Sequence, residues 1–404
     1  MAEPLRRSEV PPMRYAEVTD RLAGLGSEKW VLYTAAAARR RAGRPVIDLT
    51  IGEPDVPTPA PLIASATRAM ASGRTGYSNG RGEPALLEAL SRRYTALAGR
   101  HIGTDRFLCL PGTQTALYAA LRAVCDPGCE VILGDPMYAT YEGLIRAAGG
   151  VPVPVPLDPA RGFRMQAGDV AARITPAARA LLLNTPHNPT GAVLGPGDLA
   201  ALCGLAAERG LWVISDEVYG DLTHGGAVFT SALADPAHEA RVIVAASISK
   251  SHAAPGFRAG WLCASAEFCR RALPLCETML FGSQPFIADM AAEALSGPSD
   301  TARAMAGRMA RRAARVHAAL DGVAGLAVHR PEAGMFALVD VRALGGDSQA
   351  LALALLEAEE VAVMPGASFG ASLEGWWRLA LTAGDAETDE ASARIARFAR
   401  GWRG

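Results

Sequence analysis

The chain has 404 residues, of which 50% are hydrophobic and 20% are charged, and its formal net charge at pH 7 is −1. This composition is typical of a globular protein with a large core, and it excludes a disordered or fibrous chain. The balanced charge gives no electrostatic reason to expect nucleic acid or an anionic membrane as a partner. Residues 1–12 lack the apolar stretch of a secretory signal, and no apolar run is long enough to cross a membrane. We therefore expect a cytoplasmic protein.

In the first two thirds of the chain, short apolar runs alternate with longer segments rich in alanine and leucine. The predicted strands are 107–110, 130–133, 180–184, 211–215, 242–246 and 259–264, and the predicted helices include 113–124 and 197–208. Apolar strands separated by helices predict an α/β fold with a parallel sheet covered on both faces. The alternating valines and prolines of 151–156 predict an extended connector.

After about residue 285 the pattern changes to a long helix rich in alanine and arginine, predicted at 298–319. A shorter α+β pattern follows, with predicted strands at 326–329, 335–341, 360–364 and 378–381. We predict a large domain of residues 46–285 and a smaller C-terminal domain of residues 286–404. Residues 1–45 are expected to form an N-terminal arm that joins the small domain.

Seven cysteines are scattered through mostly apolar surroundings, so we expect them to be reduced core residues. Cys125 and Cys129 have a spacing that could ligate a metal, but no second pair or histidine cluster completes a zinc site. We therefore expect no metal.

Lysine is rare in this chain: there are two lysines, Lys29 and Lys250, against 38 arginines. Lys29 lies in a polar N-terminal stretch, whereas Lys250 follows the apolar run 242–246 and has Ser247 and Ser249 beside it. A lysine at the end of a buried strand is desolvated, which lowers its pKa and favours imine formation with carbonyls. A lysine at a strand end can equally be a surface residue with a buried stem.

Three other predicted strands are followed by polar residues suited to a ligand. Asp216 and Tyr219 come directly after strand 211–215, although a carboxylate there can also cap a helix. The segment 184–191 contains two prolines and two side-chain amides, and such runs often form only a turn. In 111–116, glycine, hydroxyl and amide residues open a helix, where they could hold a phosphate or act as an ordinary cap.

Together, in this order and spacing, these segments resemble the fold-type I, class I/II aminotransferases, which use pyridoxal 5'-phosphate (PLP). The resemblance extends from about Gly52 to Arg378. It also includes the motifs 52–55, Tyr77 with Ser78, 188–191 and 364–366. It implies a large domain with a mostly parallel seven-stranded sheet between helices, and a smaller α+β domain. It further implies a homodimer with shared active sites.

The resemblance implies a role for each matching residue. Lys250 bonds to the cofactor aldehyde and then moves a proton between the substrate Cα and the cofactor C4′. Asp216 keeps the pyridine nitrogen protonated, so that the ring accepts electrons, and Arg378 clamps the substrate carboxylate. PLP and pyridoxamine phosphate alternate during the reaction. The other implied roles are Tyr219 and Asn188 at the ring oxygen, Tyr138 on the ring face, Gly112, Thr113, Gln114, Ser247, Ser249 and Arg258 at the phosphate, Tyr77 at the phosphate of the partner subunit, and Gly52, Asn188 and Tyr33 at the substrate.

Within the family, the segments 136–142, 186–188, 249–252 and 279–283 look most like arginine–pyruvate transaminases. This implies L-arginine as amino donor, or a cyclised derivative of the enduracididine type found in antibiotic pathways, with pyruvate or another 2-oxo acid as acceptor. The abundant alanine, glycine and arginine would suit an actinobacterial source of such pathways. A guanidinium requires a carboxylate or an aromatic face. The candidates are Glu28, Tyr33, Tyr141, Glu142 and the loop 281–284 of the partner subunit.

Other PLP chemistry on an amino acid, such as β-elimination, decarboxylation or oxidation, stays open because those enzymes also bind a carboxylate. So does a broader or aromatic donor specificity. A ligand-sensing transcription factor is disfavoured, since too few residues precede Gly52 to form a DNA-binding domain. Residues 366–370 match the G-x-S-x-G motif of hydrolases, but the last histidine is His329, so the required later histidine is missing.

Overall fold

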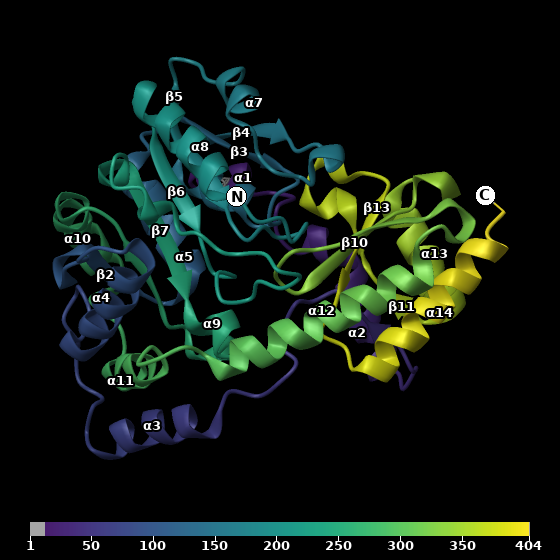
Figure 1. Ribbon diagram of the computed structural model, residues 1–404, viewed down its shortest axis with the longest axis horizontal. Helices are drawn as coiled ribbons and strands as arrows, with labels where there is room; N and C mark the ends of the chain where they lie inside the picture. The colour runs from purple at the N-terminus through teal and green to yellow at the C-terminus, as the bar shows by residue number, and fades with distance from the viewer. Residues whose placement is uncertain (1–12, 404) are drawn as a thin grey trace, which may run out of the picture.

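The computed structural model describes residues 13–403, except for the side chains of Ser27 and Glu28. Its main body is a seven-stranded sheet with the order β2-β8-β7-β6-β5-β3-β4 (Figure 1). The strands are β2 Phe107–Leu110, β3 Glu130–Asp135, β4 Val151–Pro156, β5 Ala178–Asn184, β6 Trp212–Asp216, β7 Val242–Ser247 and β8 Gly260–Cys263. The prediction of an α/β fold with a mostly parallel seven-stranded sheet is confirmed.

Both faces of this sheet are buried, because successive strand residues enter two different hydrophobic clusters. Leu181 and Leu183 of β5 pack in one cluster, and Ala180 and Leu182 pack in the other. The helices of the first cluster are α3 Ala60–Ala71, α4 Pro84–Ala98, α8 Pro196–Glu208 and α11 Pro285–Ala294. Those of the second are α5 Gly112–Val124, α6 Tyr141–Ala148 and α10 Ala266–Leu280. Burial on two faces explains why the strands are nearly continuous apolar runs.

Strand β8 runs opposite to the others, since it pairs antiparallel with both β7 and β2, whereas the pairs among β3 to β7 are parallel. The start of β8 therefore lies at the edge where the other strands end. Arg258, two residues before β8, reaches this edge together with Pro111, Asp216 and Ser247. Residues far apart in the chain thus meet along one edge of the sheet.

Residues 151–156 form the edge strand β4, and the prediction of a connector is wrong. The backbone N–H groups of Val151 and Leu157 donate to Cys129 O and Asp135 O of the β3 side, at 2.8 and 2.7 Å. Backbone N–H groups point alternately to the two sides of a strand, and those of Val151 and Leu157 point toward β3. The prolines at 152, 154 and 156 therefore lack N–H groups only on the outer side, away from β3. Proline is tolerated on such an edge, where no ladder hydrogen bond is lost.

A second, antiparallel sheet has the order β12-β13-β10-β9 and lies at the other end of the molecule (Figure 1). Its strands are β9 Ala327–His329, β10 Phe336–Asp340, β12 Met364–Pro365 and β13 Trp376–Ala380, and its helices are α12 Asp300–Leu320, α13 Ser348–Glu359 and α14 Asp385–Gly401. This is the predicted smaller α+β unit. Short helices elsewhere are α1 Glu17–Arg21, α7 Ala167–Ala171 and α9 Ile248–Ser251.

The N-terminal segment packs against the smaller unit. Strand β1 (Ile47–Asp48) pairs parallel with β11 (Val361–Ala362), and Leu32 and Ala36 of α2 (Val31–Arg41) belong to its hydrophobic cluster. By contrast, α11 lies in the cluster of the large sheet, where it packs on α3 and α4. We therefore propose that the boundary between the two domains follows Leu295 rather than residue 285.

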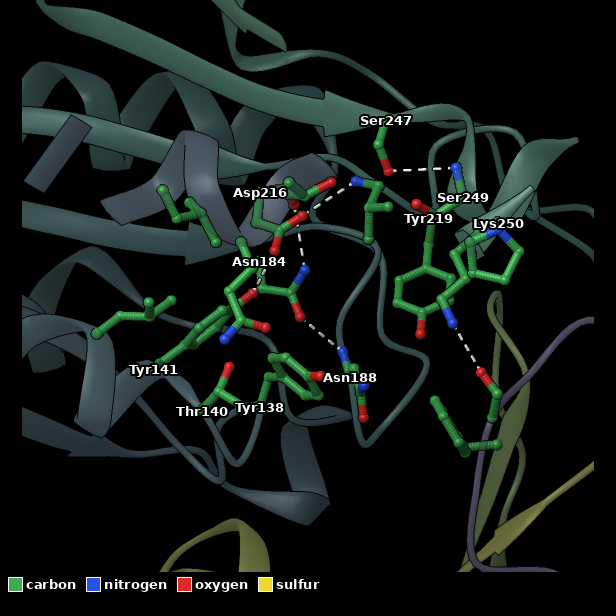
Figure 2. A pocket seen from close by; sticks show the side chains of 18 of the residues that line it. Tyr138, Thr140, Tyr141, Asn184, Asn188, Asp216, Tyr219, Ser247, Ser249 and Lys250 are labelled. Atoms are coloured by element: carbon green, nitrogen blue, oxygen red, sulfur yellow. Dashed lines mark hydrogen bonds between the residues drawn. The ribbon is translucent and has the colours of Figure 1, made fainter. Parts of the chain in front are cut away.

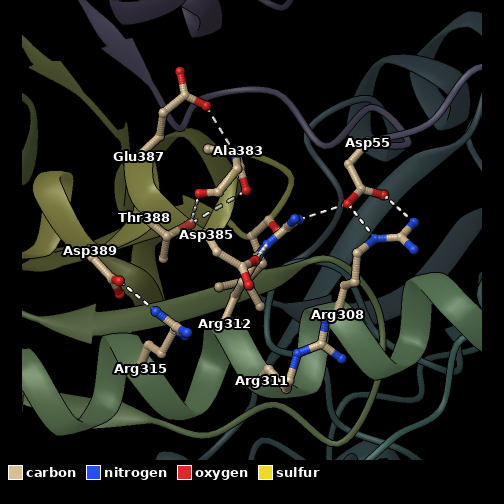
Figure 3. A network of polar contacts seen from close by, with 12 residues as sticks. Asp55, Arg308, Arg311, Arg312, Arg315, Ala383, Asp385, Glu387, Thr388 and Asp389 are labelled. Atoms are coloured by element: carbon tan, nitrogen blue, oxygen red, sulfur yellow. Dashed lines mark hydrogen bonds and ion pairs between the residues drawn. The ribbon is translucent and has the colours of Figure 1, made fainter.

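Helix α12 carries a network of ion pairs that joins the two units (Figure 3). Asp55 accepts hydrogen bonds from Arg308 Nε and Nη2 at 2.7 and 2.8 Å, and from Arg312 Nη1 at 2.8 Å. Arg312 also donates to Asp385 Oδ1 and to Leu381 O, at 2.8 and 2.9 Å. This ties the segment 52–55 to the smaller unit.

All seven cysteines are free and buried. Within residues 13–403, no helix combines the length and apolar character needed to cross a membrane.

Candidate active site

A cavity of about 250 Å³ opens at the strand ends of the large sheet, next to strands β10 and β13 (Figure 2). Most of the residues singled out in the sequence line it. They are Gly52, Thr113, Gln114, Tyr138, Tyr141, Asn188, Asp216, Tyr219, Ser247, Ser249, Lys250, Arg258 and Arg378. The fold thus brings together residues that are up to about three hundred positions apart in the chain.

Lys250 lies on the short helix α9, directly after β7, and Ser247 Oγ caps this helix by accepting a hydrogen bond from Ser249 N at 3.3 Å. The Lys250 ammonium donates to Gly52 O at 2.7 Å (Figure 2). Burial lowers the pKa of Lys250 to about 8, with Glu53 opposing this shift and two arginines adding to it. A larger fraction of the amine is therefore neutral, and so nucleophilic, near neutral pH than for a free lysine.

Asp216 is a buried carboxylate at the end of β6 with two hydrogen bonds. Tyr141 Oη donates to Oδ2 at 2.7 Å, and Val218 N donates to Oδ1 at 3.1 Å (Figure 2). Burial raises the pKa of Asp216 to about 6, although both hydrogen bonds oppose this. Since no cation pairs with it among the described residues, a positively charged ligand atom would relieve this cost. The protonated pyridine nitrogen of PLP fits this position.

The groups at the start of α5 are suited to an anion. Gly112, the first residue of α5, has a φ of +83°, and a Cβ there would lie 2.2 Å from Arg258 Nη2. Glycine therefore lets the guanidinium approach the start of the helix. The hydroxyl oxygen of Thr113 is buried and has no hydrogen-bond partner within the described residues. Unpaired helix N–H groups, an orphaned hydroxyl and an arginine fit the phosphate of PLP.

Arg378 enters the cavity from β13, where its guanidinium is stacked between the rings of Phe336 and Phe369, 3.9 and 4.3 Å from their centroids. It donates to Asn188 Oδ1 at 3.2 Å and to Thr50 O at 2.5 Å. Its Nε is buried without a partner in the described part of the chain, and burial lowers the pKa of Arg378 to about 10. A guanidinium that contacts two aromatic rings and has an unpaired Nε–H suits a carboxylate ligand.

Three of the residues named in the sequence, Tyr33, Glu142 and Tyr77, do not line this cavity. Tyr33 is 40% exposed and does not line it, and Glu142 is paired with Lys29 and Arg146 instead. Tyr77 is 91% exposed and lies edge-to-face on Phe281, at a ring distance of 4.8 Å. The side chain of Glu28 lies outside the described residues.

The sequence pattern missed several cavity residues, among them Trp30, Thr140 and Phe336. Trp30 and Phe336 lie in segments with no local motif, so only the folded chain reveals them. One indirect signal existed: a Cβ on Gly52 would lie 2.2 Å from the ring of Phe336, so the glycine marks a close approach.

The chain matches known proteins over nearly its whole length. A family model described as aminotransferase class I and II covers residues 44–395. The arginine–pyruvate transaminase of Pseudomonas aeruginosa is 40% identical over 95% of this chain and 98% of its own length. The aspartate/prephenate aminotransferase of Thermus thermophilus is 36% identical over 89% of this chain and 92% of its own length. A solved aspartate aminotransferase of Thermus thermophilus, a double mutant, has a TM-score of 0.88 at 30% identity, over 96% of this chain and all of that one (100%).

Proposed function

Because the chain belongs to the aminotransferase class I and II family and is a PLP-dependent aminotransferase, we propose that its amino donor is L-arginine or a related amino acid with a guanidinium group. The acceptor is pyruvate or another 2-oxo acid. The observation that carries this proposal is the 40% identity to the arginine–pyruvate transaminase, against 36% for the aspartate/prephenate enzyme. A cyclised arginine derivative of the enduracididine type has the same recognisable group.

The charges of the cavity support a donor without a second carboxylate. Lys250, Arg258 and Arg378 are its basic lining residues within the described chain. In the proposed roles these three serve the cofactor aldehyde, the phosphate and the substrate α-carboxylate. A dicarboxylic donor such as aspartate would need a further cation from outside this set. The aromatic side chain of Trp30 instead suits a guanidinium and its aliphatic stem.

When bound, PLP supplies an aldehyde that bonds to amines and a ring that accepts electrons from the substrate Cα. In our proposal the Lys250 amine then removes the Cα proton and returns one to the cofactor carbon. Arg378 fixes the α-carboxylate and so orients the Cα–H bond toward Lys250. Asp216 holds a proton on the ring nitrogen, and Tyr141 and Val218 keep that carboxylate in position.

The remaining assigned residues bind the cofactor in this proposal. Tyr138 stacks on the ring face, and Tyr219 and Asn188 donate to the ring oxygen. The phosphate is held by residues at the start of α5, by α9 and by Arg258. These are Gly112, Thr113 and Gln114 at the start of α5, and Ser247 and Ser249 at the start of α9.

We also propose that the enzyme is a homodimer in which Tyr77 contacts the phosphate bound by the partner subunit. The exposed pair of Tyr77 and Phe281, 91% and 63% exposed, supports this. Two large aromatic rings in contact on a surface are typical of an interface.

The test is a single half-reaction with a panel of amino donors. We expect L-arginine and a cyclised guanidino amino acid to convert bound PLP to pyridoxamine phosphate at least about tenfold faster than citrulline, leucine, tyrosine or aspartate. Absorbance follows the cofactor, and mass spectrometry identifies the 2-oxo acid. Conversion by aspartate or leucine but by no guanidino donor would refute the donor assignment. Ammonia release with PLP retained would indicate elimination or oxidation instead.

A further inference from the structure

An ion pair between Lys29 and Glu142 lies beside the wall of the cavity. Lys29 Nζ is 3.2 Å from Glu142 Oε2 and 3.4 Å from Ala139 O. The neighbours of both partners, Trp30 and Tyr141, line the cavity. The Lys29 ammonium therefore lies next to the proposed donor site, where it is paired with the Glu142 carboxylate.

Lysine at this position is notable in a chain that otherwise uses arginine. The chain has 40 basic residues other than histidine, of which two are lysines, and the other lysine is Lys250. An ammonium is a point charge on a flexible stem, whereas a guanidinium grips a carboxylate with two parallel hydrogen bonds. A guanidinium is therefore the better ligand for Glu142 and can replace the Lys29 ammonium.

The carboxylate of Glu142 is held ready for such a replacement. Its other oxygen, Oε1, accepts a hydrogen bond from Arg146 Nε at 3.1 Å, one helical turn along α6. This contact would orient the carboxylate after Lys29 leaves. Asp216 is the one acidic residue among the described residues that line the cavity, and Tyr141 and Val218 already hold its two oxygens. Glu142 does not line the cavity, but it is an acidic group beside the wall formed by Trp30 and Tyr141 whose cation can be exchanged.

The release of the Lys29 side chain need not disturb the cavity wall. Its backbone carbonyl accepts a separate hydrogen bond from Ser368 Oγ at 3.1 Å. The ion pair is partly exposed, with 20% of the Lys29 side chain and 27% of the Glu142 side chain accessible. Such pairs contribute little to stability, so breaking this one costs little.

We propose that Lys29 is an internal substitute for the amino donor: the guanidinium of the bound donor displaces the Lys29 ammonium and pairs with Glu142. Glu142 is then the specificity-determining carboxylate. Lys29 pairs with it when no donor is bound. This inference rests on the proposed function, because it requires a donor with a guanidinium group.

The test compares L-arginine with citrulline, which has nearly the same shape but no charge, in the half-reaction of the PLP-bound enzyme. Glu142→Gln should lower the ratio of kcat/KM for arginine over citrulline by about tenfold or more. Lys29→Gln removes the competing cation and should lower KM for arginine, by up to about fivefold given the small energy of such pairs. Lys29→Arg introduces a guanidinium that competes more strongly for Glu142, so this variant should raise KM for arginine. Glu267→Gln, which removes an exposed pair with Arg271 on α10, is the matched control and should change none of these values.

The direction of the Lys29 effects distinguishes an exchange from a purely structural contact. If Lys29→Gln raises KM for arginine, or if Glu142→Gln leaves the donor ratio unchanged, the inference is overturned while the donor assignment stands. If the wild-type enzyme converts no guanidino donor, the proposed function fails and this inference fails with it. The visible absorbance of bound PLP verifies that each variant is folded.

Discussion

Two groups of buried charged residues in this molecule differ in how their hydrogen bonds are satisfied. In the network on α12, Asp55 accepts from Arg308 and Arg312, and Arg312 also reaches Asp385 (Figure 3). In the cavity, Arg378 Nε and Thr113 Oγ1 are buried and have no partner within residues 13–403. Buried polar groups are usually paired, so two unpaired groups that line one cavity favour a ligand-binding role for it.

Burial by itself does not separate the two groups. Arg312 and Arg378 are 5% and 2% exposed, respectively. Burial raises the pKa of Asp55, but the hydrogen bonds from Arg308 and Arg312 outweigh it and the net shift is downward. For Arg378, burial dominates and lowers the pKa to about 10. The Arg312 guanidinium pairs with carboxylates of this chain, Asp55 and Asp385, whereas the Arg378 guanidinium is suited to the carboxylate of a ligand.

The largest expected effect comes from removing the amine of the cavity. Lys250→Ala should reduce turnover by about 10³-fold or more, because Lys250 is the one lysine among the described residues that line the cavity and is the group proposed to move the Cα proton. The variant should bind PLP without the absorbance of a covalent link. Full turnover by this variant would show that the assignment of Lys250 is wrong.

Breaking the paired network should reduce stability. Arg312→Met leaves Asp55 and Asp385 without one of their cations, so we expect a loss of about 3 kcal/mol or more in the free energy of unfolding. Urea denaturation measures it. The matched control is Arg315→Met, which removes an exposed pair with Asp389 and should cost about 1 kcal/mol at most. Equal losses in the two variants would show that the buried network stabilises the fold no more than an exposed ion pair does.

Replacing Arg378, which has no carboxylate partner among the described residues, should reduce activity rather than stability. Arg378→Met should lower kcat/KM about a hundredfold for all α-amino acid donors, because the carboxylate loses its bidentate partner. Its thermal midpoint without substrate should stay equal or rise, since a buried unpaired charge is replaced by an apolar side chain. A fall in the midpoint as large as that of Arg312→Met would contradict this.

The smallest effect concerns pH. Because the pKa of Lys250 is lowered to about 8, the neutral amine is the main form above pH 8 and decreases about tenfold per unit below it. The rate at which PLP recombines with the cofactor-free enzyme should therefore rise up to about pH 8 and then level off. Nα-acetyllysine, with an ordinary pKa, is the control and should continue to rise toward pH 10. A similar rise for the enzyme would contradict the lowered pKa.

The sequence predicted those parts of the fold and site that depend on local patterns. Lys250 and Asp216 follow apolar strands, and parallel strands bring their ends to one edge, so their meeting could be expected. Arg258 reached the same edge through the reversal of β8, which no local pattern reveals. The family resemblance, rather than periodicity, supplied the role of Arg378.

The errors arose where distant segments meet. Glu142 was expected at the cavity, but Lys29 from the N-terminal segment pairs with it. Trp30 and Phe336 enter the cavity from segments without any motif. The prolines of β4 suggested a connector, because the sequence does not reveal that this strand is an edge.

The prolines of β4 also limit how molecules of this protein can associate. An edge strand normally offers a row of N–H groups to which another chain can add a strand. Here every second residue from 152 to 156 has no N–H to offer on the outer side. At the opposite edge, Arg81 O accepts from Cys109 N, and the Arg81 side chain binds two carbonyls of the segment that leads into β2. Both edges are thus obstructed, so we expect that copies of this protein do not associate by continuing the large sheet.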